Sequence, residues 1–323
     1  MPRSLDQAVV AITGASSGIG RAAALRFARR RSRLALCARA EEPLREVAGA
    51  CEAAGAEVLA QPLDVADEAA VEAFAAAAVA RFGRLDVWVN NAATIAYGEF
   101  AEIPPEVFRG VIETNLMGQV HGARAALRYF LEQDEGVLIN MSSVWGRVSS
   151  PLVSPYVISK AAARSLAECL RGELVDRPGI QVTTMAPQAV DTPIFDHGAN
   201  YAGRRLRPIP PVLPVERVAA GIEACAESPK REVNYGVAGK LLELLYTLLP
   251  PLYRRFAHGA FVGGTLSPRP AGPSPGNVLA PSPPHRVEGL WRRQRRANLR
   301  HAMLGAVAAA AAGLLAAPRK PSG

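Results

Sequence analysis

Short apolar runs alternate with longer segments of helical spacing along most of this chain. Apolar runs of four to eight residues bounded by turn formers predict buried strands, and apolar positions three to four residues apart predict helices. The runs predict strands at 8–13, 33–39, 56–64, 84–92, 136–143, 179–187 and 231–236. The segments between them predict helices at 18–30, 41–54, 67–81, 105–133, 154–175 and 214–228. Strands that alternate with helices predict the α/β class, here a Rossmann-type, doubly wound parallel sheet of about seven strands.

The pattern changes near residue 237. Residues 240–256 are apolar nearly all round, apart from an interruption at Pro250 and Pro251, and residues 268–284 hold seven prolines. Such a proline content predicts a linker without fixed structure. We therefore expect a single domain with a C-terminal extension, divided into a domain at 1–256 that includes a proline-rich loop at 191–214, a linker at 257–290, and a basic, alanine-rich tail at 291–323.

Basic residues are concentrated at the C-terminal end. The chain has 37 Lys and Arg against 29 Asp and Glu, but from Arg254 onward 11 basic residues face one acid, Glu288. The preceding body is therefore close to neutral, which argues against a nucleic-acid partner. An anionic membrane surface is the candidate partner of the tail.

Residues 302–317 follow a basic flank and are mostly alanine. Three interpretations stay open for this run: a membrane anchor or short spanning helix, a helix packed on the body or a partner, and a disordered tail. The four cysteines have no metal or CxxC spacing, and an apolar strand begins without a preceding signal-like run. These features predict a cytoplasmic protein, with attachment to a membrane through the tail as an option, and no metal site.

A glycine-rich turn, TGASSGIG at 13–20, joins the first predicted strand to the first helix. Such a turn brings backbone N–H groups and a helix N-terminus close to a pyrophosphate. The turn thus predicts a dinucleotide site formed by Gly14, Ser16, Ser17, Gly18, Ile19 and Gly20. The second strand ends in Arg39, where an NAD site would place an acid, so we expect NADP(H) with Arg39 at the 2′-phosphate. Arg39 could instead be a solvated helix-cap residue.

Tyr156 and Lys160 lie one helical turn apart in the run SPYVISK. A phenol with an ordinary pKa of about 10 is a poor acid or base at neutral pH. An ammonium about 4 Å away in a partly dry site would lower the phenol's pKa toward neutrality by Coulomb attraction. The pair therefore predicts general acid–base chemistry.

These motifs occur in one order with LDV at 63–65, NNA at 90–92, Asn115 in ETNLMG, and Ser143. Taken together, they resemble the classical short-chain dehydrogenase/reductase family over about residues 7–236. The resemblance implies that Tyr156 is the acid/base, that Lys160 lowers its pKa and holds the nicotinamide ribose, that Ser143 binds the substrate oxygen, and that Asn115 holds a water. It further implies a cofactor set that includes Asp64, Val65, Asn91, Ala92 and Thr192. Asp64 could alternatively be an N-cap.

Two departures from the family pattern are visible: Ala93 follows NNA where glycine is common, and Gln188 follows Pro187 where glycine is common. The resemblance implies an NADP(H)-dependent oxidoreductase that interconverts a carbonyl and a secondary alcohol on a small-molecule substrate. The apolar 240–253 segment favours an apolar substrate. A non-catalytic NADP-binding sensor or scaffold is the alternative, and an epimerase or dehydratase would need a larger substrate domain. The helices at 105–133 and 154–176 predict a homodimer or homotetramer by family likeness.

Overall fold

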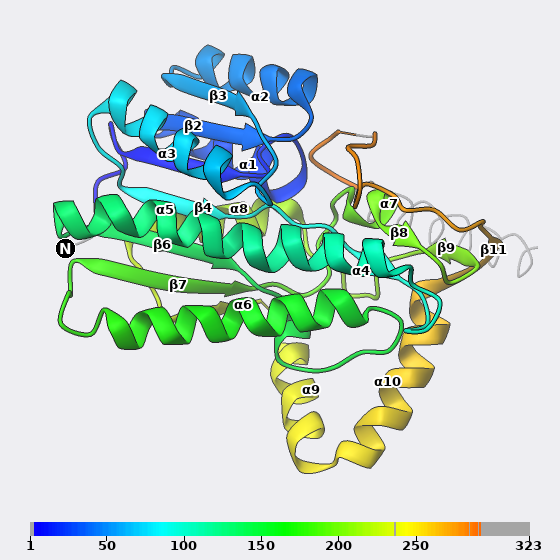
Figure 1. Ribbon diagram of the computed structural model, residues 1–323. Helices are drawn as coiled ribbons and strands as arrows, with labels where there is room; N and C mark the ends of the chain where they lie inside the picture. Colours follow the sequence, from blue (N-terminus) through cyan, green and yellow to red (C-terminus); the bar gives the residue numbers. More distant parts are fainter. Residues whose placement is uncertain (1–2, 236, 284, 290, 292–323) are drawn as a thin grey trace, which may run out of the picture.

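Seven parallel strands form the central sheet in the order β10-β7-β6-β4-β1-β2-β3 (Figure 1). The computed structural model describes residues 3–291 apart from 236, 284 and 290. The strands are β1 (Val9–Thr13), β2 (Arg33–Ala38), β3 (Val58–Pro62), β4 (Val87–Asn90), β6 (Gly136–Met141), β7 (Ile180–Ala186) and β10 (Glu232–Asn234). This confirms the predicted doubly wound, Rossmann-type α/β fold.

Helices cover both faces of the sheet and bury two apolar cores. One face carries α1 (Gly18–Arg29), α2 (Glu41–Ala53) and α8 (Val215–Glu227). The other carries α3 (Glu68–Phe82), α5 (Gly118–Gln133) and α6 (Ser154–Glu173). Strand order reverses beside β1, which pairs with β2 on one side and β4 on the other. In open α/β sheets ligands bind at the carboxyl ends of the strands that flank such a reversal, so the fold itself locates the cleft.

The long helix predicted at 105–133 is interrupted. The chain forms α4 (Pro105–Ile112), then a π-helical turn η1 (Glu113–Met117), then α5. A π turn inserts one extra residue per hydrogen-bonded ring and is common at functional sites. Here it turns the buried Asn115 toward its neighbours from other elements.

The substrate side of the fold is built from short elements and a helical hairpin. A short helix η2 (Val144–Gly146) follows β6, and small strands β5 (Ala96–Tyr97) and β8 (Ala199–Asn200) pair with each other. The loop predicted at 191–214 contains α7 (Ile194–His197) and β9 (Arg204–Leu206), which are too short to leave a periodic pattern. Beyond β10, α9 (Val237–Leu248) and α10 (Pro250–Thr265) form a hairpin that breaks at the predicted prolines (Figure 1).

The prediction of an unstructured linker over 268–284 was wrong for the residues that the structure describes. Strand β11 (Leu266–Pro270) pairs with β9, and the chain then crosses the carboxyl end of the sheet. Proline removes backbone donors but leaves carbonyl acceptors, so an extended proline-rich segment can be held by donors from the body. We call residues 271–289 the strap. The run 302–317, with its three interpretations, lies outside the described residues.

Candidate active site

The glycine turn between β1 and α1 is shaped by close backbone contacts. Gly14 has φ of +65°, and a Cβ added there would lie 2.7 Å from the Ala92 Cα atom. A Cβ on Gly20 would lie 2.3 Å from the Gly14 carbonyl oxygen. Gly18 begins α1 with φ of +53°. Glycine is therefore required here both by conformation and by space, and the turn leaves a backbone cradle at a helix N-terminus, the geometry that suits a pyrophosphate.

Asn91 and Ala92 support this cradle from β4. The Asn91 side-chain Nδ2 donates to the carbonyl oxygens of Thr13 and Gly14 at 2.9 and 3.1 Å. The backbone N–H groups of Asn91 and Ala92 both donate to Thr13 Oγ1 at 3.0 Å. The Asn91 amide is thus committed to holding the glycine turn, while the residue still lines the pocket beside it.

Arg39 lies at the far end of the pocket, beside Asp64. Its guanidinium donates hydrogen bonds to the carbonyl oxygens of Val278, at 3.1 Å, and Asn277, and lies 3.7 Å from an Asp64 carboxylate oxygen. Asp64 lines the pocket and also accepts from the Ala66 N–H at 3.0 Å. The alternative that Asp64 caps the following helix was wrong, because the N-cap of α3 is Asp67, which accepts from the Ala70 N–H at 3.1 Å. Arg39 is a charged donor group at the end of β2, where a 2′-phosphate would need one.

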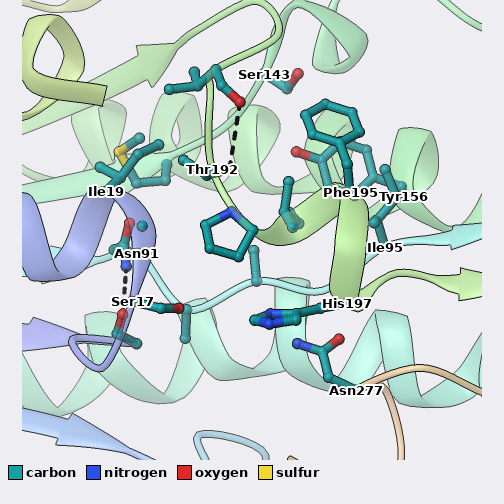
Figure 2. Close-up of a pocket in the computed structure, with 18 of the residues that line it drawn as sticks. Ser17, Ile19, Asn91, Ile95, Ser143, Tyr156, Thr192, Phe195, His197 and Asn277 are labelled. Atoms are coloured by element: carbon teal, nitrogen blue, oxygen red, sulfur yellow. Dashed lines mark hydrogen bonds between the residues drawn. The ribbon is translucent and has the colours of Figure 1, made fainter. Parts of the chain in front are cut away.

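Tyr156 and Ser143 lie at the other end of the same pocket (Figure 2), which Lys160 also lines. Helix α6 begins at Ser154 with proline at its start, which places Tyr156 and Lys160 in its first two turns. Ser143 follows β6 and hydrogen-bonds the Tyr156 phenol. Lys160 Nζ donates to the Met141 carbonyl oxygen at 2.8 Å and lies 5.5 Å from the centroid of the Tyr156 ring.

Burial controls the protonation of this pair. Burial raises the pKa of Tyr156 to about 12, although its hydrogen bond to Ser143 opposes the rise. Burial also lowers the pKa of Lys160 to about 7. Loss of solvation is the largest effect on the phenol and raises its pKa, so the expected lowering of this pKa by Lys160 stays a prediction. Tyr156 is a protonated phenol at neutral pH, which is the form of a proton donor.

Asn115 and Gly20 lie behind the pocket and do not line it. Asn115 is fully buried, accepts from the Thr94 N–H at 2.7 Å, and donates to the Thr94 carbonyl and to Ser159 Oγ at 2.9 and 3.1 Å. It therefore joins the loop after β4 to α6, one residue from Lys160. The other sequence-predicted residues all line one pocket: Gly14, Ser16, Ser17, Gly18, Ile19, Arg39, Asp64, Val65, Asn91, Ala92, Ser143, Tyr156, Lys160 and Thr192.

Apolar and aromatic side chains surround the Tyr156 end of the pocket. Trp145 stands edge-on to the Tyr156 ring at 5.8 Å between centroids, and Phe261 of α10 packs on Trp145 at 5.2 Å. Ile95 and Phe195 lie close to Tyr156 in Figure 2, and Leu242 of α9 completes this side. The whole pocket, from the glycine turn to Tyr156, has a volume of about 330 Å³, within the range of small-molecule sites.

The strap supplies pocket residues that the sequence did not identify. Asn277, Pro281, Ser282 and His285 line the pocket. Asn277 Oδ1 accepts from Thr94 Oγ1 at 2.7 Å, and its backbone N–H donates to the His197 carbonyl oxygen at 2.8 Å.

The strap also contacts the helix N-terminus, where the Gly18 N–H donates to the Arg286 carbonyl oxygen at 3.0 Å. A proline-rich run carries no periodicity or spacing that points to such contacts. His197 also lines the pocket and lies 5.7 Å from His285 between ring centroids.

Among residues 3–291 that are described, no cluster of histidine, cysteine or acidic side chains could hold a metal ion. The pocket does fit a nicotinamide dinucleotide: a glycine cradle on a helix N-terminus, a guanidinium at one end and a phenol and an ammonium at the other. In the same described part of the chain, no helix combines the length and the apolar character needed to cross a bilayer.

Comparison with known proteins agrees with this geometry. The short chain dehydrogenase family model matches residues 8–200. An uncharacterized oxidoreductase, YxnA of Bacillus subtilis, is 32% identical over 280 residues, which are 86% of this chain and 79% of that protein. A short-chain dehydrogenase/reductase from Burkholderia phymatum in complex with NAD superposes with a TM-score of 0.69 at 30% identity, covering 78% of this chain and 97% of that one.

A second solved structure is an alcohol dehydrogenase from Thermococcus sibiricus complexed with 5-hydroxy-NADP. It gives a TM-score of 0.61 at 29% identity, over 71% of this chain and 95% of that one. The similar structures thus carry both kinds of nicotinamide cofactor.

Proposed function

Because the chain belongs to the short-chain dehydrogenase family of oxidoreductases, we propose that it interconverts a carbonyl and a secondary alcohol with NADP(H), using Tyr156 as the proton donor and acceptor. The observation that carries this proposal is the single pocket bordered by the glycine turn at one end and by Tyr156, Ser143 and Lys160 at the other. Bound nicotinamide would supply or accept the hydride.

Each polar group at the Tyr156 end has a distinct task in this proposal. Ser143 hydrogen-bonds the phenol and, with it, would hold the substrate oxygen. Tyr156 would give its proton to that oxygen as a carbonyl is reduced. Lys160, held by the Met141 carbonyl, would bind the nicotinamide ribose. A phenol with its pKa raised to about 12 retains its proton at neutral pH, and this is the form that can donate a proton to a carbonyl oxygen.

The cofactor assignment rests on Arg39 and the glycine turn. Arg39 offers a guanidinium at the end of β2, and charge-assisted hydrogen bonds to phosphate are about twice as strong as neutral ones. No acid replaces it at the end of β2, although Asp64 lies 3.7 Å away. We therefore propose NADP(H) over NAD(H), with Gly18 and Ile19 at the pyrophosphate.

Two further features are proposed for the whole chain. The substrate is an apolar small molecule, as the ring of Trp145, Phe195, Ile95 and Leu242 favours. The tail at 291–323 attaches the protein to an anionic membrane. A chain cut after Trp291 keeps the strap, and weaker vesicle binding by this chain than by the full-length protein would support the second feature.

A panel of carbonyl compounds incubated with NADPH and NADH tests the proposed reaction, followed by the absorbance of the reduced nicotinamide. We expect faster oxidation of NADPH with apolar ketones or aldehydes than with polar ones. Tyr156→Phe is the control, since it retains the ring and lacks the proton. Equal turnover by wild type and Tyr156→Phe would refute the assignment of Tyr156.

A further inference from the structure

One side of the α9–α10 hairpin is fixed to the active-site end of the body. The Arg147 guanidinium donates to Glu243 on α9 and also bonds Glu232 at 2.7 Å. The Tyr253 hydroxyl on α10 donates to the Ser149 carbonyl oxygen at 2.6 Å. Polar side chains of the hairpin are therefore turned inward, toward the segment that follows β6.

The other side of the hairpin is apolar and faces solvent. Seven of the twelve large apolar residues that are exposed in the described part of the chain lie on this hairpin. Six of them are 52–66% exposed: Leu241, Leu244, Leu248, Leu249, Leu252 and Phe256. Single exposed apolar residues are ordinary, whereas a contiguous cluster marks an interaction surface. Figure 1 shows the hairpin projecting away from the sheet, with the turn between α9 and α10 at its far end.

The charges on this surface indicate which kind of partner it would bind. Arg254 and Arg255 are exposed in α10, just after the apolar turn. From residue 244 to residue 287 the sequence contains no Asp or Glu. A second copy of this chain would bring the same acid-free surface against its arginines, without a counter-charge. An anionic lipid surface offers acyl chains to the leucines and headgroup phosphates to the arginines, as with interfacial amphipathic helices.

The same hairpin forms the wall of the substrate pocket. Leu242, next to the exposed Leu241, lines the pocket, and Phe261 packs on the Trp145 ring that contacts Tyr156. A surface that enters the lipid headgroup region would thus belong to the same hairpin that supplies part of the apolar wall of the active site.

We infer that the α9–α10 hairpin seats this protein on an anionic bilayer, with Leu248, Leu249 and Leu252 inserted and Arg254 and Arg255 at the headgroups. The pocket then receives a lipid-soluble carbonyl compound from the bilayer side. The substrate part of this inference rests on the proposed function, and the lipid part does not.

Vesicle binding by the full-length chain tests the lipid part. Leu248→Glu combined with Leu249→Glu should lower the partition coefficient on phosphatidylcholine–phosphatidylglycerol vesicles by roughly tenfold or more, about 1.4 kcal/mol. Val175→Glu is the matched control, because Val175 is also an exposed apolar residue, at 74%, but lies outside the hairpin. Unchanged binding of the double variant would overturn the inference and leave the binding to another part of the chain.

Tryptophan quenching tests whether the hairpin inserts among the acyl chains, separately from whether the protein binds to the vesicle surface. Leu249→Trp should be quenched by vesicles with brominated acyl chains beyond the quenching of the wild-type tryptophans, whereas Phe100→Trp, at a 72% exposed position, should not. Equal quenching in both variants would overturn insertion. Light scattering without lipid tests whether a second copy of this chain occupies the surface instead. If the double variant had a different oligomer mass from the wild type and kept its vesicle binding, the surface would be a self-association site.

Measurements of turnover distinguish delivery of the substrate through the hairpin from the proposed carbonyl–alcohol reaction itself. The double variant should lose activity on a long-chain ketone carried in vesicles and keep its kcat/KM for a short water-soluble ketone. If both substrates were affected equally, delivery through the hairpin would be refuted. If the wild type reduced no carbonyl compound with either cofactor, the proposed function would fail while the vesicle results still decided the lipid part.

Discussion

Replacement of Arg39 by aspartate should reverse the cofactor preference. In the structure the guanidinium bonds two strap carbonyls and lies 3.7 Å from Asp64. A hydrogen bond to a charged group contributes about 1.5–3 kcal/mol, against about 1 kcal/mol for a neutral one. When the guanidinium exchanges its carbonyl acceptors for the 2′-phosphate of NADPH, the binding free energy becomes more favourable by roughly 1.4 kcal/mol. This corresponds to tenfold tighter binding of NADPH than of NADH. In Arg39→Asp a carboxylate would face that phosphate beside Asp64, and NADH should bind more tightly.

The measurement is the ratio of the two dissociation constants, from calorimetry or from energy transfer between the pocket tryptophan, Trp145, and the reduced nicotinamide. The substitution also releases the strap carbonyls, but that change affects both cofactors and cancels in the ratio. Arg45→Asp is the matched control, since Arg45 pairs with Glu41 and Glu42 on the exposed side of α2. Equal constants for NADPH and NADH in the wild type, or an unchanged ratio in Arg39→Asp, would refute the reasoning.

Four further outcomes are expected. Tyr156→Phe should reduce kcat by roughly hundredfold or more and leave the cofactor dissociation constant nearly unchanged, and a smaller loss would exclude it as the acid. Burial lowers the pKa of Lys160 to about 7 in the folded chain. Above that pH the unfolded chain, in which the lysine has its ordinary pKa, therefore binds more protons than the folded chain. Stability should therefore rise with pH from about 7 to about 10.5, and denaturant titrations should show a weaker rise in Lys160→Met. Gly20→Ala forces a Cβ to within 2.3 Å of a carbonyl oxygen and should destabilise the fold, whereas Gly49→Ala meets no atom within 4 Å and should stabilise α2 by about 0.5–1 kcal/mol. The faces of α5 and α6 should pair in a homodimer or homotetramer, and a monomer mass by light scattering would contradict this.

The fold could be predicted from the sequence because its signals are local. Each buried strand is a short apolar run, each covering helix has helical spacing, and the turn after β1 carries its own glycine pattern. The pocket residues that belong to these elements, such as Gly18 and Tyr156, were found for the same reason.

The remaining features depend on contacts between distant segments. The π turn at 113–117 has ordinary helical composition, and its purpose appears only where Asn115 reaches Thr94 and Ser159. The raised pKa of Tyr156 follows from its burial by residues distant in the sequence, which no spacing of tyrosine and lysine reveals. The strap contacts come from carbonyl groups, which every residue has, so the sequence of 271–289 gives no sign of them.

The strap makes completion of the pocket a later event than assembly of the sheet during synthesis of the chain. Gly18 begins the first helix, yet its N–H contacts the carbonyl of Arg286, and Arg39 contacts Asn277. The last strand of the sheet ends at Asn234, so the body can assemble before the strap has left the ribosome. At about 5–20 residues per second, the strap follows the sheet by roughly 3–10 seconds. During that interval the glycine turn and Arg39 lack their strap partners, and a chain that ends early never gains them.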